Sequence, residues 1–178
     1  VNGSTDILNG NIGDDVILGD NGLLDFAFDG DTDPATLDLV RSFIDGWGGT
    51  DIISGNAGED VILGGTGGDE IYGDDSIASA GSADGQDIIL GDNGIIRLLG
   101  DVEGRLEIRG TAVRFIHTSD EENATGGADT ISGNAMGDVI LGGAAGDTIY
   151  GDAASTGAND GDDVILGDNG LLHFAFGG

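Results

Sequence analysis

Aspartate recurs at one place of a nine-residue frame that repeats along the chain. The segments GNAGEDVIL (55–63) and GGTGGDEIY (64–72) both have Gly at places 1 and 4, Asp at place 6 and Ile at place 8. Nine aspartates hold place 6 of such units: Asp15, Asp51, Asp60, Asp69, Asp87, Asp129, Asp138, Asp147 and Asp163. Carboxylates at a fixed spacing, beside the backbone carbonyls of glycine-rich turns, are the hard oxygen ligands of which Ca²⁺ takes about six to eight. The pattern therefore predicts calcium binding.

The charge of the chain favours the same kind of partner. Asp and Glu number 34 and Lys and Arg number 5, which gives a net charge of −29. A folded surface of that charge repels itself unless cations neutralise it, and it excludes nucleic acid and anionic membranes as direct partners. Cysteine is absent, which excludes disulfides and thiolate metal sites. With 38% hydrophobic residues the chain is too apolar for a solvated acidic coil, yet no apolar run reaches the length needed for membrane insertion.

The elements that must hold these aspartates follow from the rest of the frame. Glycine at places 1 and 4 gives a tight turn its backbone freedom, and places 7 to 9 form a short strand whose place-8 Ile faces inward. One unit is then one turn and one strand, and two units make one coil of two parallel sheets with a column of Ile between them. Turns two units apart lie side by side on one edge, where their carboxylates repel one another until a cation enters.

A longer repeat lies over the short one. GDDVILGDNGLLDFAF (13–28) returns as GDDVILGDNGLLHFAF (161–176) with one difference, and GQDIILGDNGIIRLLG (85–100) is a weaker middle copy. The chain thus covers slightly more than one long period. We expect further copies to flank it, because repeat arrays stack similar units on one another.

The short units resemble the RTX nonapeptide repeat, G-G-x-G-x-D-x-U-x, of hemolysin-type calcium-binding proteins, over residues 1–27, 46–99 and 124–176. The resemblance implies an all-β fold, a right-handed parallel β-roll (β-solenoid) of nonapeptide repeats, with Ca²⁺ between neighbouring loops. It also implies that the place-6 aspartates are ligands together with carbonyls of places 1 to 4. The candidate carbonyls belong to Gly46, Gly55, Gly58, Gly64, Gly65, Gly67, Gly133 and Gly142.

Four aspartate pairs are complete on this basis, so the resemblance implies at least four bound Ca²⁺. The pairs are Asp51 with Asp69, Asp60 with Asp87, Asp129 with Asp147, and Asp138 with Asp163.

Some units depart from the frame. Met136 and Ala145 replace Gly at place 4, which puts a Cβ where the turn needs a positive φ. Three units that begin GDNG have an apolar residue at place 6, namely Leu24, Ile96 and Leu172. Their aspartate stands at place 2 instead, and we interpret these units as the terminal loops of each block, with half-sites at Asp20, Asp92 and Asp168.

Two insertions divide the coils into the blocks 1–24, 46–96 and 124–178 of one continuous array. Residues 25–45 and 97–123 alternate apolar and polar residues between Gly and Asp-Pro turns, a pattern typical of strands and β-hairpins. All five arginines lie in these insertions: Arg41, Arg97, Arg105, Arg109 and Arg114. Either they balance acids on an exposed sheet, or they contact the acidic edge of a neighbouring block or chain.

One of the two sheets is predicted to be apolar on both faces. Places 7 and 9 point away from the Ile column, and in alternate units, which share a sheet, they are Val, Ile or Leu. The outer stripe of that sheet includes Val61, Leu63, Ile88, Leu90, Val139 and Leu141. Because an exposed stripe of this kind marks an interface, either neighbouring repeats or identical chains cover it, or the insertions fold back over it.

The sequence does not point to an enzyme. His117 and His173 are isolated, and no catalytic triad order, metal-binding His pair or phosphate loop is present. The expected function is a calcium-binding structural module of a large repetitive secreted or cell-surface protein, such as a scaffold, an adhesin stalk or an extracellular filament. The alternatives are the C-terminal folding and secretion domain of a type I-secreted enzyme and, less favoured, an ice-binding roll. Weak calcium sites need millimolar Ca²⁺, so we expect an extracellular location, reached by the bacterial type I route.

Overall fold

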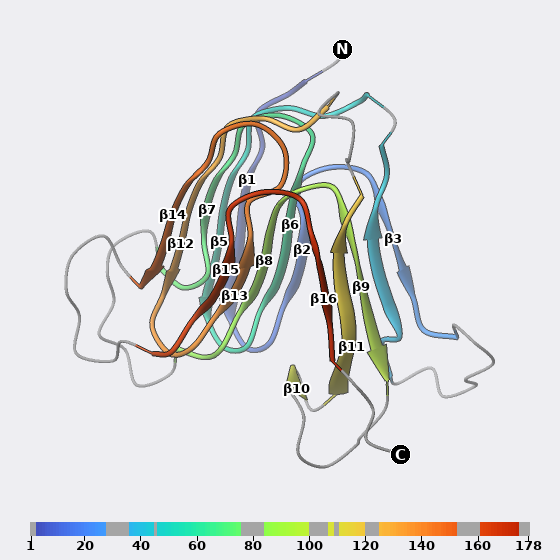
Figure 1. The fold of residues 1–178 in the computed structure, drawn as a ribbon, viewed down its shortest axis with the longest axis vertical. Coiled ribbons are helices and arrows are strands. Elements are labelled where there is room, and N and C mark those ends of the chain that lie inside the picture. The colour runs from blue at the N-terminus through green and yellow to red at the C-terminus, as the bar shows by residue number, and fades with distance from the viewer. Residues whose placement is uncertain are drawn as a thin grey trace.

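The computed structural model describes residues 3–27, 36–44, 46–75, 84–99, 107–108, 111–119, 125–152 and 161–174. Over these residues the protein is all-β, with parallel sheets and no helix (Figure 1). A helix long and apolar enough to cross a membrane is accordingly absent from these ranges. The frame explains the preference for strands, since glycine disfavours helix and the β-branched residues at alternate places favour short strands.

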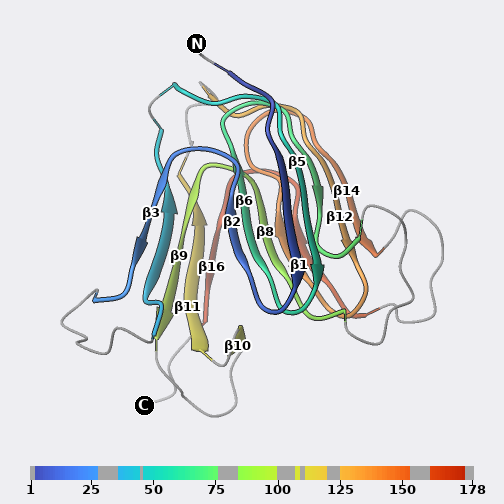
Figure 2. The same cartoon turned by 180° about the vertical axis from the view of Figure 1, so that it is seen from behind.

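Two parallel sheets contain the repeat units. The first sheet has the order β1 (Ile7–Ile12), β5 (Ile52–Ala57), β7 (Glu70–Tyr72), β12 (Thr130–Asn134) and β14 (Thr148–Asp152). The second sheet, taken from the same end, has the order β2 (Val16–Leu18), β6 (Val61–Gly65), β8 (Ile88–Asp92), β13 (Val139–Leu141) and β15 (Val164–Leu166). The chain visits the two sheets alternately, so a first-sheet strand and the second-sheet strand after it form one coil. Successive coils lie side by side (Figures 1 and 2).

The place-8 isoleucines fill the space between these sheets. Ile53 is in register with Ile71 in the first sheet, and Ile62 is in register with Ile89 in the second. The buried members of the column are Ile17, Ile53, Ile62, Ile71, Ile89, Ile131 and Ile140. Because side chains alternate between the faces of a strand, one inward Ile in each three-residue strand is enough to build this thin core.

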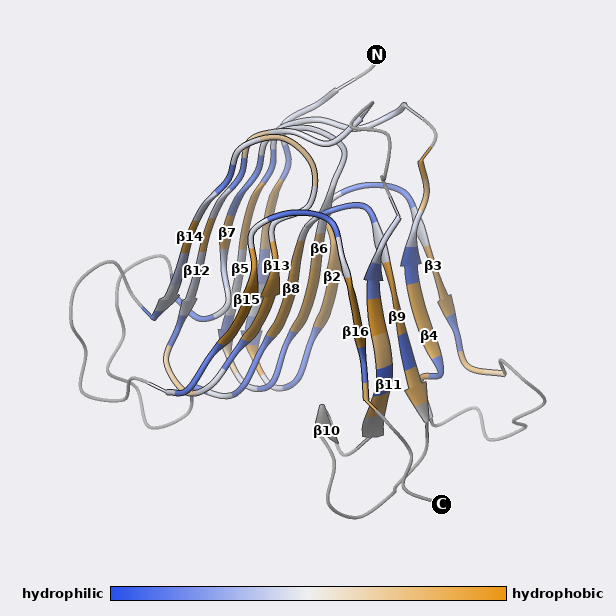
Figure 3. Cartoon of the chain, viewed as in Figure 1, coloured by the Kyte–Doolittle hydropathy of each residue, from blue (hydrophilic) through white to orange (hydrophobic). Residues whose placement is uncertain are grey.

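A third, antiparallel sheet lies over the outer face of the second sheet. Its strands are β3 (Gly22–Asp25), β4 (Leu39–Ser42), β9 (Gly94–Leu99), β10 (Glu107–Ile108), β11 (Thr111–Thr118) and β16 (Leu171–His173). Figure 3 shows that the second sheet, which this layer covers, is a continuous band of hydrophobic strands. The strand character predicted for the insertions is thus present in the part of them that the structure describes.

The GDNG units leave the coils earlier than predicted. Their place-6 residues lie in or beside third-sheet strands rather than in terminal loops: Leu24, Ile96 and Leu172. A Cβ at Gly22 would clash with the side chain of Leu18, and one at Gly94 would clash with Leu90. Glycine at these positions allows the chain to turn sharply from the second sheet into the third, so the block boundaries at 24 and 96 fall inside strands.

The apolar stripe of the second sheet is buried within the chain. Its six predicted members, Val61, Leu63, Ile88, Leu90, Val139 and Leu141, are each 0–2% exposed. They pack in one cluster with inward residues of the third sheet: Val40, Ile96, Leu98, Val113 and Ile116. Of the two alternatives that the sequence left open, the structure therefore has the second for these six residues: the chain's own insertions fold back over them.

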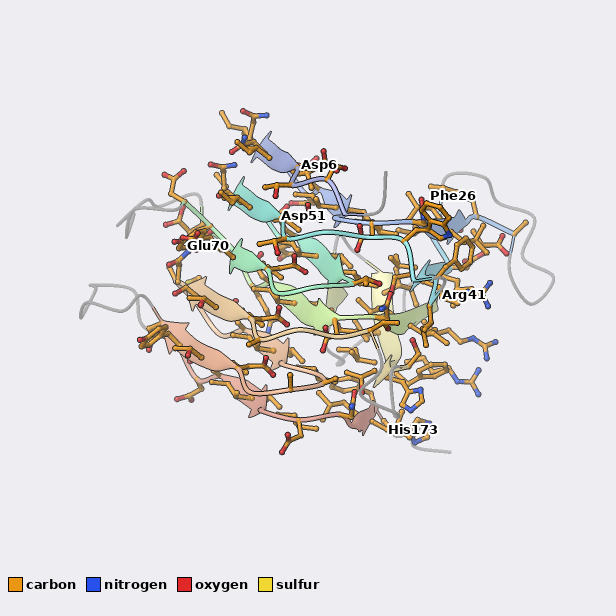
Figure 4. All side chains as sticks on the ribbon, turned by 90° about the horizontal axis from the view of Figure 1, so that it is seen from above. Asp6, Phe26, Arg41, Asp51, Glu70 and His173 are labelled. Carbon is orange, nitrogen blue, oxygen red and sulfur yellow. The ribbon has the colours of Figure 1, made fainter. Side chains whose placement is uncertain are left out.

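The described arginines lie on the far side of that layer or beside it. Val40 and Ile96 face the second sheet, so their neighbours Arg41 and Arg97 face outward, and Figure 4 shows Arg41 directed away from the coils. The Arg41 guanidinium lies over the Phe43 ring, 5.1 Å from its centroid. Arg114 is in β11, while Arg105 and Arg109 lie outside the described residues.

Candidate metal centre

Five of the turns between strands share one backbone form. Place 2 has positive φ and is Asn or Gly: Asn11, Asn56, Gly65, Asn134 and Gly143. Place 4 also has positive φ: Gly13 (113°), Gly58 (139°), Gly67 (111°), Met136 (72°) and Ala145 (78°). The expectation that Met136 and Ala145 carry a Cβ into a positive-φ position is confirmed. The asparagines at place 2 have the same explanation, because Asn tolerates this conformation better than most residues with a side chain.

The place-6 aspartates form two ladders, one along each edge of the coils. In every step the backbone N–H of one aspartate donates to Oδ1 of the aspartate on the next coil, over 2.7–3.0 Å. The first-edge ladder, where the chain enters the first sheet, is Asp6, Asp51, Asp69, Asp129 and Asp147. The second-edge ladder, where the chain enters the second sheet, is Asp15, Asp60, Asp87, Asp138 and Asp163. Figure 4 shows Asp6 and Asp51 on neighbouring coils.

These ladders bring together all nine predicted aspartates and add Asp6, from a degraded unit. The four pairs inferred from the resemblance are each neighbours in a ladder. The insertions do not interrupt the ladders: Asp69 is followed directly by Asp129, and the Asp69 N–H donates to Asp129 Oδ1 over 2.7 Å.

Each ladder aspartate of the three interior coils keeps one oxygen out of these bonds. Its backbone carbonyl accepts the N–H of the residue after the aspartate on the next coil, as in the bond from Glu70 N to Asp51 O (2.9 Å). Its Oδ1 accepts the amide of the coil before. The Oδ2 atoms of Asp15, Asp51, Asp69, Asp87, Asp129, Asp138 and Asp147 are buried and accept no hydrogen bond. A buried carboxylate oxygen in this condition is costly unless it has a cationic partner.

A backbone carbonyl of the next coil faces the same space as Oδ2. At the place-1 glycine of the turn, a Cβ would clash with both oxygens; at Gly64 these are Asp69 Oδ2 and the Gly91 carbonyl. The arrangement repeats with the pairs Asp15–Gly55, Asp51–Gly64, Asp60–Gly73, Asp69–Gly91, Asp87–Gly133, Asp129–Gly142, Asp138–Gly151 and Asp147–Gly167. Glycine therefore keeps open a small space lined by oxygen atoms from two coils.

The candidate carbonyls inferred from the resemblance divide into two groups. Gly55, Gly64, Gly133 and Gly142 have their carbonyls beside an Oδ2. The other four do not show that arrangement: the carbonyls of Gly58 and Gly67 face the place-4 turn of the next coil, Gly65 lies against the Asp20 carboxylate, and no atom lies near the Cβ position of Gly46.

Sequence reasoning missed four carbonyls that complete the set: Gly73, Gly91, Gly151 and Gly167. Each is a place-1 glycine that directly follows a strand triplet and precedes Asp. The Gly-Asp dipeptide directly after a strand is the sequence signal that could have identified them.

The place-2 aspartates bind backbone amides of neighbouring turns. Asp20 Oδ2 accepts the N–H of Thr66 (2.6 Å), and Asp92 accepts the N–H groups of Gly127 and Ala144 with its two oxygens. Asp92 is fully buried, and its two hydrogen bonds link turns of three coils. Asp168, on the last coil, is exposed.

Asp74, a place-2 aspartate that the sequence analysis did not select, belongs with this group. Its Oδ2 accepts the N–H of Ala135 (3.0 Å), while its Oδ1 is buried and accepts no hydrogen bond. The same Gly-Asp dipeptide after a strand could have identified it, since Gly73-Asp74 follows Tyr72 as Gly91-Asp92 follows Leu90.

Burial raises the pKa of four ladder aspartates on interior coils by a large amount. Desolvation is the largest cause in each case, and it raises the pKa of Asp69 to about 8, of Asp87 to about 10, of Asp129 to about 9 and of Asp138 to about 8. The amide bond from the preceding coil lowers each value in part, and neighbouring carboxylates raise it further. Carboxylates held in this way at neutral pH attract either a proton or a cation.

The donor set fits calcium. Each space contains carboxylate and carbonyl oxygens and no nitrogen or sulfur ligand, which suits a hard cation and not zinc or copper. In the ranges that the structure describes, no three acidic or His side chains converge as a metal cluster. The spaces are instead built from one carboxylate and backbone carbonyls, and they recur from coil to coil.

Comparison with protein-family models, curated proteins and solved structures finds no match. The repeated oxygen-lined turn is therefore the observation on which function must be argued. The two histidines do not join it: His117 lies in β11 and His173 in β16, both on the third sheet.

Proposed function

We propose that this chain is a calcium-stabilised structural module built as an RTX-type β-roll. The observation that carries the proposal is the recurrent pairing of a buried, unbonded Asp Oδ2 with a glycine carbonyl of the next coil. Charge supports it, since a chain at −29 without a single lysine needs cations to neutralise its turns.

The path of the chain supports the β-roll part of the proposal. The two parallel sheets have the same strand order, and successive coils alternate between them, as the turns of a solenoid do. The right-handed sense follows from the preference of parallel crossovers for that hand. The third sheet is then a cover added to one face of the roll.

Calcium, when bound, would supply positive charge between two coils at once. Asp Oδ2 atoms and place-1 carbonyls would hold it, and the place-2 and place-4 residues would keep the turn in the shape that presents them. Ordering one turn in this way helps to order the next, because both contribute oxygens to the same space. Stability would then be spread along the roll and would depend on free Ca²⁺.

The proposed location follows from the Ca²⁺ affinity expected of such sites. Shared sites with few carboxylates bind weakly, in the range of extracellular modules, so we propose a secreted or cell-surface location. The long repeat favours a scaffold, stalk or filament made of many such modules, for which the type I route of secretion is the proposed path.

Calcium titration of the chelated chain, followed by far-ultraviolet circular dichroism and by native mass spectrometry, tests the proposal. We expect β-structure to form cooperatively near millimolar Ca²⁺ but not with Mg²⁺, which prefers a tighter octahedral shell. At saturation we expect about eight ions, one for each carboxylate–carbonyl pair. A native-like β signal in excess chelator, with no ions bound on adding Ca²⁺, would show the proposal to be wrong.

A further inference from the structure

Asp74 has a buried carboxylate oxygen that the ladders do not explain. The residue is 0% exposed and directly follows Gly73, at the start of the turn that joins β7 to β8. Its Oδ2 accepts the N–H of Ala135 over 3.0 Å, whereas its Oδ1 is buried and accepts no hydrogen bond. A buried carboxylate oxygen without a partner is costly, so this atom needs either a proton or a cation.

Two equivalent aspartates satisfy this oxygen with an amide from their own turn. Asp92 Oδ1 accepts the N–H of Gly127 over 3.0 Å, and Asp152 Oδ1 accepts the N–H of Gly161 over 3.1 Å. Both donors lie two residues before the ladder aspartate that ends the turn. Asp74 has no such bond, although its other oxygen is held by the next coil in the same way as that of Asp92.

The free oxygen of Asp74 lies between the same two turns as one of the oxygen-lined spaces. A Cβ at Gly73 would clash with Asp87 Oδ2 and the Gly133 carbonyl, which form a space between the β7–β8 turn and the β12–β13 turn. The bond from Ala135 N to Asp74 Oδ2 joins these two turns as well. Asp87 Oδ2 is also buried and accepts no hydrogen bond. Two carboxylates therefore each leave an oxygen unbonded between one pair of turns.

This combination is particular to Asp74. Among the carboxylates of the described residues, every other buried oxygen without a hydrogen-bond partner belongs to a ladder aspartate. Desolvation and then the Asp74 carboxylate are among the causes that raise the pKa of Asp87, and burial raises the pKa of Asp74 itself to about 7. The sequence between β7 and β8 and between β12 and β13 contains no Lys, Arg or His that could balance these charges.

We propose that these two turns hold one Ca²⁺ through two carboxylates, Asp74 and Asp87, together with the Gly133 carbonyl, and that this ion is the most tightly bound of the set. The inference rests on the proposed function and adds a ligand to one of its eight sites. Affinity for Ca²⁺ rises with the number of charged ligands, and the other spaces have one carboxylate each. The ion would join the third coil to the fourth, on the two sides of the insertion 97–123.

The experiment exchanges Tb³⁺ into the folded, Ca²⁺-saturated chain and follows the luminescence of Tb³⁺ excited through tyrosine. Tb³⁺ prefers the same oxygen ligands as Ca²⁺, and its higher charge favours the space with two carboxylates. Asp74→Asn keeps the acceptor for Ala135 and replaces Oδ1 by an amide group. Asp152→Asn is the matched control, because Asp152 holds the same place on the same edge and its Oδ1 already accepts an amide. Circular dichroism in Ca²⁺ checks that each variant is folded.

In the wild type we expect one equivalent of Tb³⁺ to enter at a concentration about tenfold or more below that needed for the rest. Asp74→Asn and Asp87→Asn should each abolish this preferred equivalent, and Asp152→Asn should retain it. Tyr72 lies two residues before Asp74, so Tyr72→Phe should remove most of the emission of the first equivalent, whereas Tyr150→Phe should not. The tyrosine variants alter no proposed ligand, so they test the location of the ion even if Asp74→Asn fails to fold.

Exchange of Tb³⁺ into all the spaces alike overturns the two-carboxylate site. A preferred equivalent that survives in folded Asp74→Asn also overturns it, as does a first equivalent whose emission does not depend on Tyr72. Each of these results leaves the proposed function standing, because the chain has bound Ca²⁺ and folded. A chain that binds no Ca²⁺ in the titration described above contradicts the proposed function itself.

Discussion

The backbone N–H of Asp87 donates to Oδ1 of Asp138, 2.8 Å away, although 51 residues separate them. The contact spans an insertion that forms strands of a different sheet, so the ladder continues regardless of what the chain does between coils. One carboxylate oxygen of each ladder aspartate is thereby fixed to its neighbour, and the other is directed into the space beside the place-1 glycine. The two oxygens have separate roles, and a substitution can distinguish them.

Asp87→Asn keeps the Oδ1 acceptor and replaces Oδ2 by an amide group. In calcium we expect this variant to bind one ion fewer and to be destabilised by about 1–3 kcal/mol, because a ligand oxygen of a buried site is lost. In chelator the sign should reverse, because folding at neutral pH requires Asp87, with its raised pKa, to take up a proton, and asparagine has no such cost. Chemical unfolding in calcium, the β signal by circular dichroism in chelator, and native mass spectrometry measure the effect.

Asp75→Asn is the control for this prediction, since Asp75 is an exposed carboxylate on an interior coil. It should change neither the ion count nor, by more than about 0.5 kcal/mol, the free energy of unfolding. Equal behaviour of the two variants in calcium would contradict the role given to Oδ2.

The calcium-free chain should be more stable in acid than at neutral pH. The folded-state pKa values of about 8 to 10 for Asp69, Asp87, Asp129 and Asp138 lie above the ordinary value of 3.8. A group with a raised folded pKa contributes stability that is fully present below its unfolded pKa and is lost as pH rises through the folded value. Without calcium, stability should therefore fall between about pH 4 and pH 10.

Thermal unfolding across this pH range, with and without calcium, checks that dependence. In saturating calcium the slope should reverse, because protons and Ca²⁺ compete for the same carboxylates. A calcium-free chain that gains stability from pH 4 to pH 8 would show that burial does not raise the pKa values of these aspartates.

The parts of the structure that repeat could be predicted from the sequence. The place-8 Ile column and the aspartate neighbours follow from a frame that sets both strand alternation and turn spacing. The cover of the second sheet could not be settled, because Leu63 and Leu141 are apolar and outward whether a second chain or an insertion buries them. Nor could the sequence identify the two glycines, Gly22 and Gly94, at which the chain turns into the third sheet. They resemble other turn glycines, and only the structure shows that a Cβ there would clash with Leu18 or Leu90.

Leu63 should be a core residue of the single chain. It is fully buried between the second and third sheets, so Leu63→Ala should destabilise the folded, calcium-bound protein by about 2–5 kcal/mol through lost contacts and a cavity. Leu171→Ala is the control, since Leu171 is 57% exposed and its truncation should cost about 0.5 kcal/mol or less. Urea unfolding at a concentration where the protein is monomeric measures both. A Leu63→Ala variant as stable as the wild type would mean that the third sheet does not cover the second in solution.

Ala145→Gly should stabilise the chain. Ala145 has φ 78° at place 4, where a side chain costs about 1–2 kcal/mol in the left-handed conformation and glycine costs nothing. Glycine also increases the conformational entropy of the unfolded chain, which opposes folding by about 0.5–1 kcal/mol. The net effect should therefore be a stabilisation of about 0.5–1 kcal/mol. Ala144→Gly, at the neighbouring residue, is the control: Ala144 is buried and absent from the positive-φ positions, so glycine there should destabilise. The two melting temperatures in calcium should move in opposite directions. Destabilisation by both variants would mean that the turn holds Ala145 without strain, and that glycine at place 4 serves another purpose.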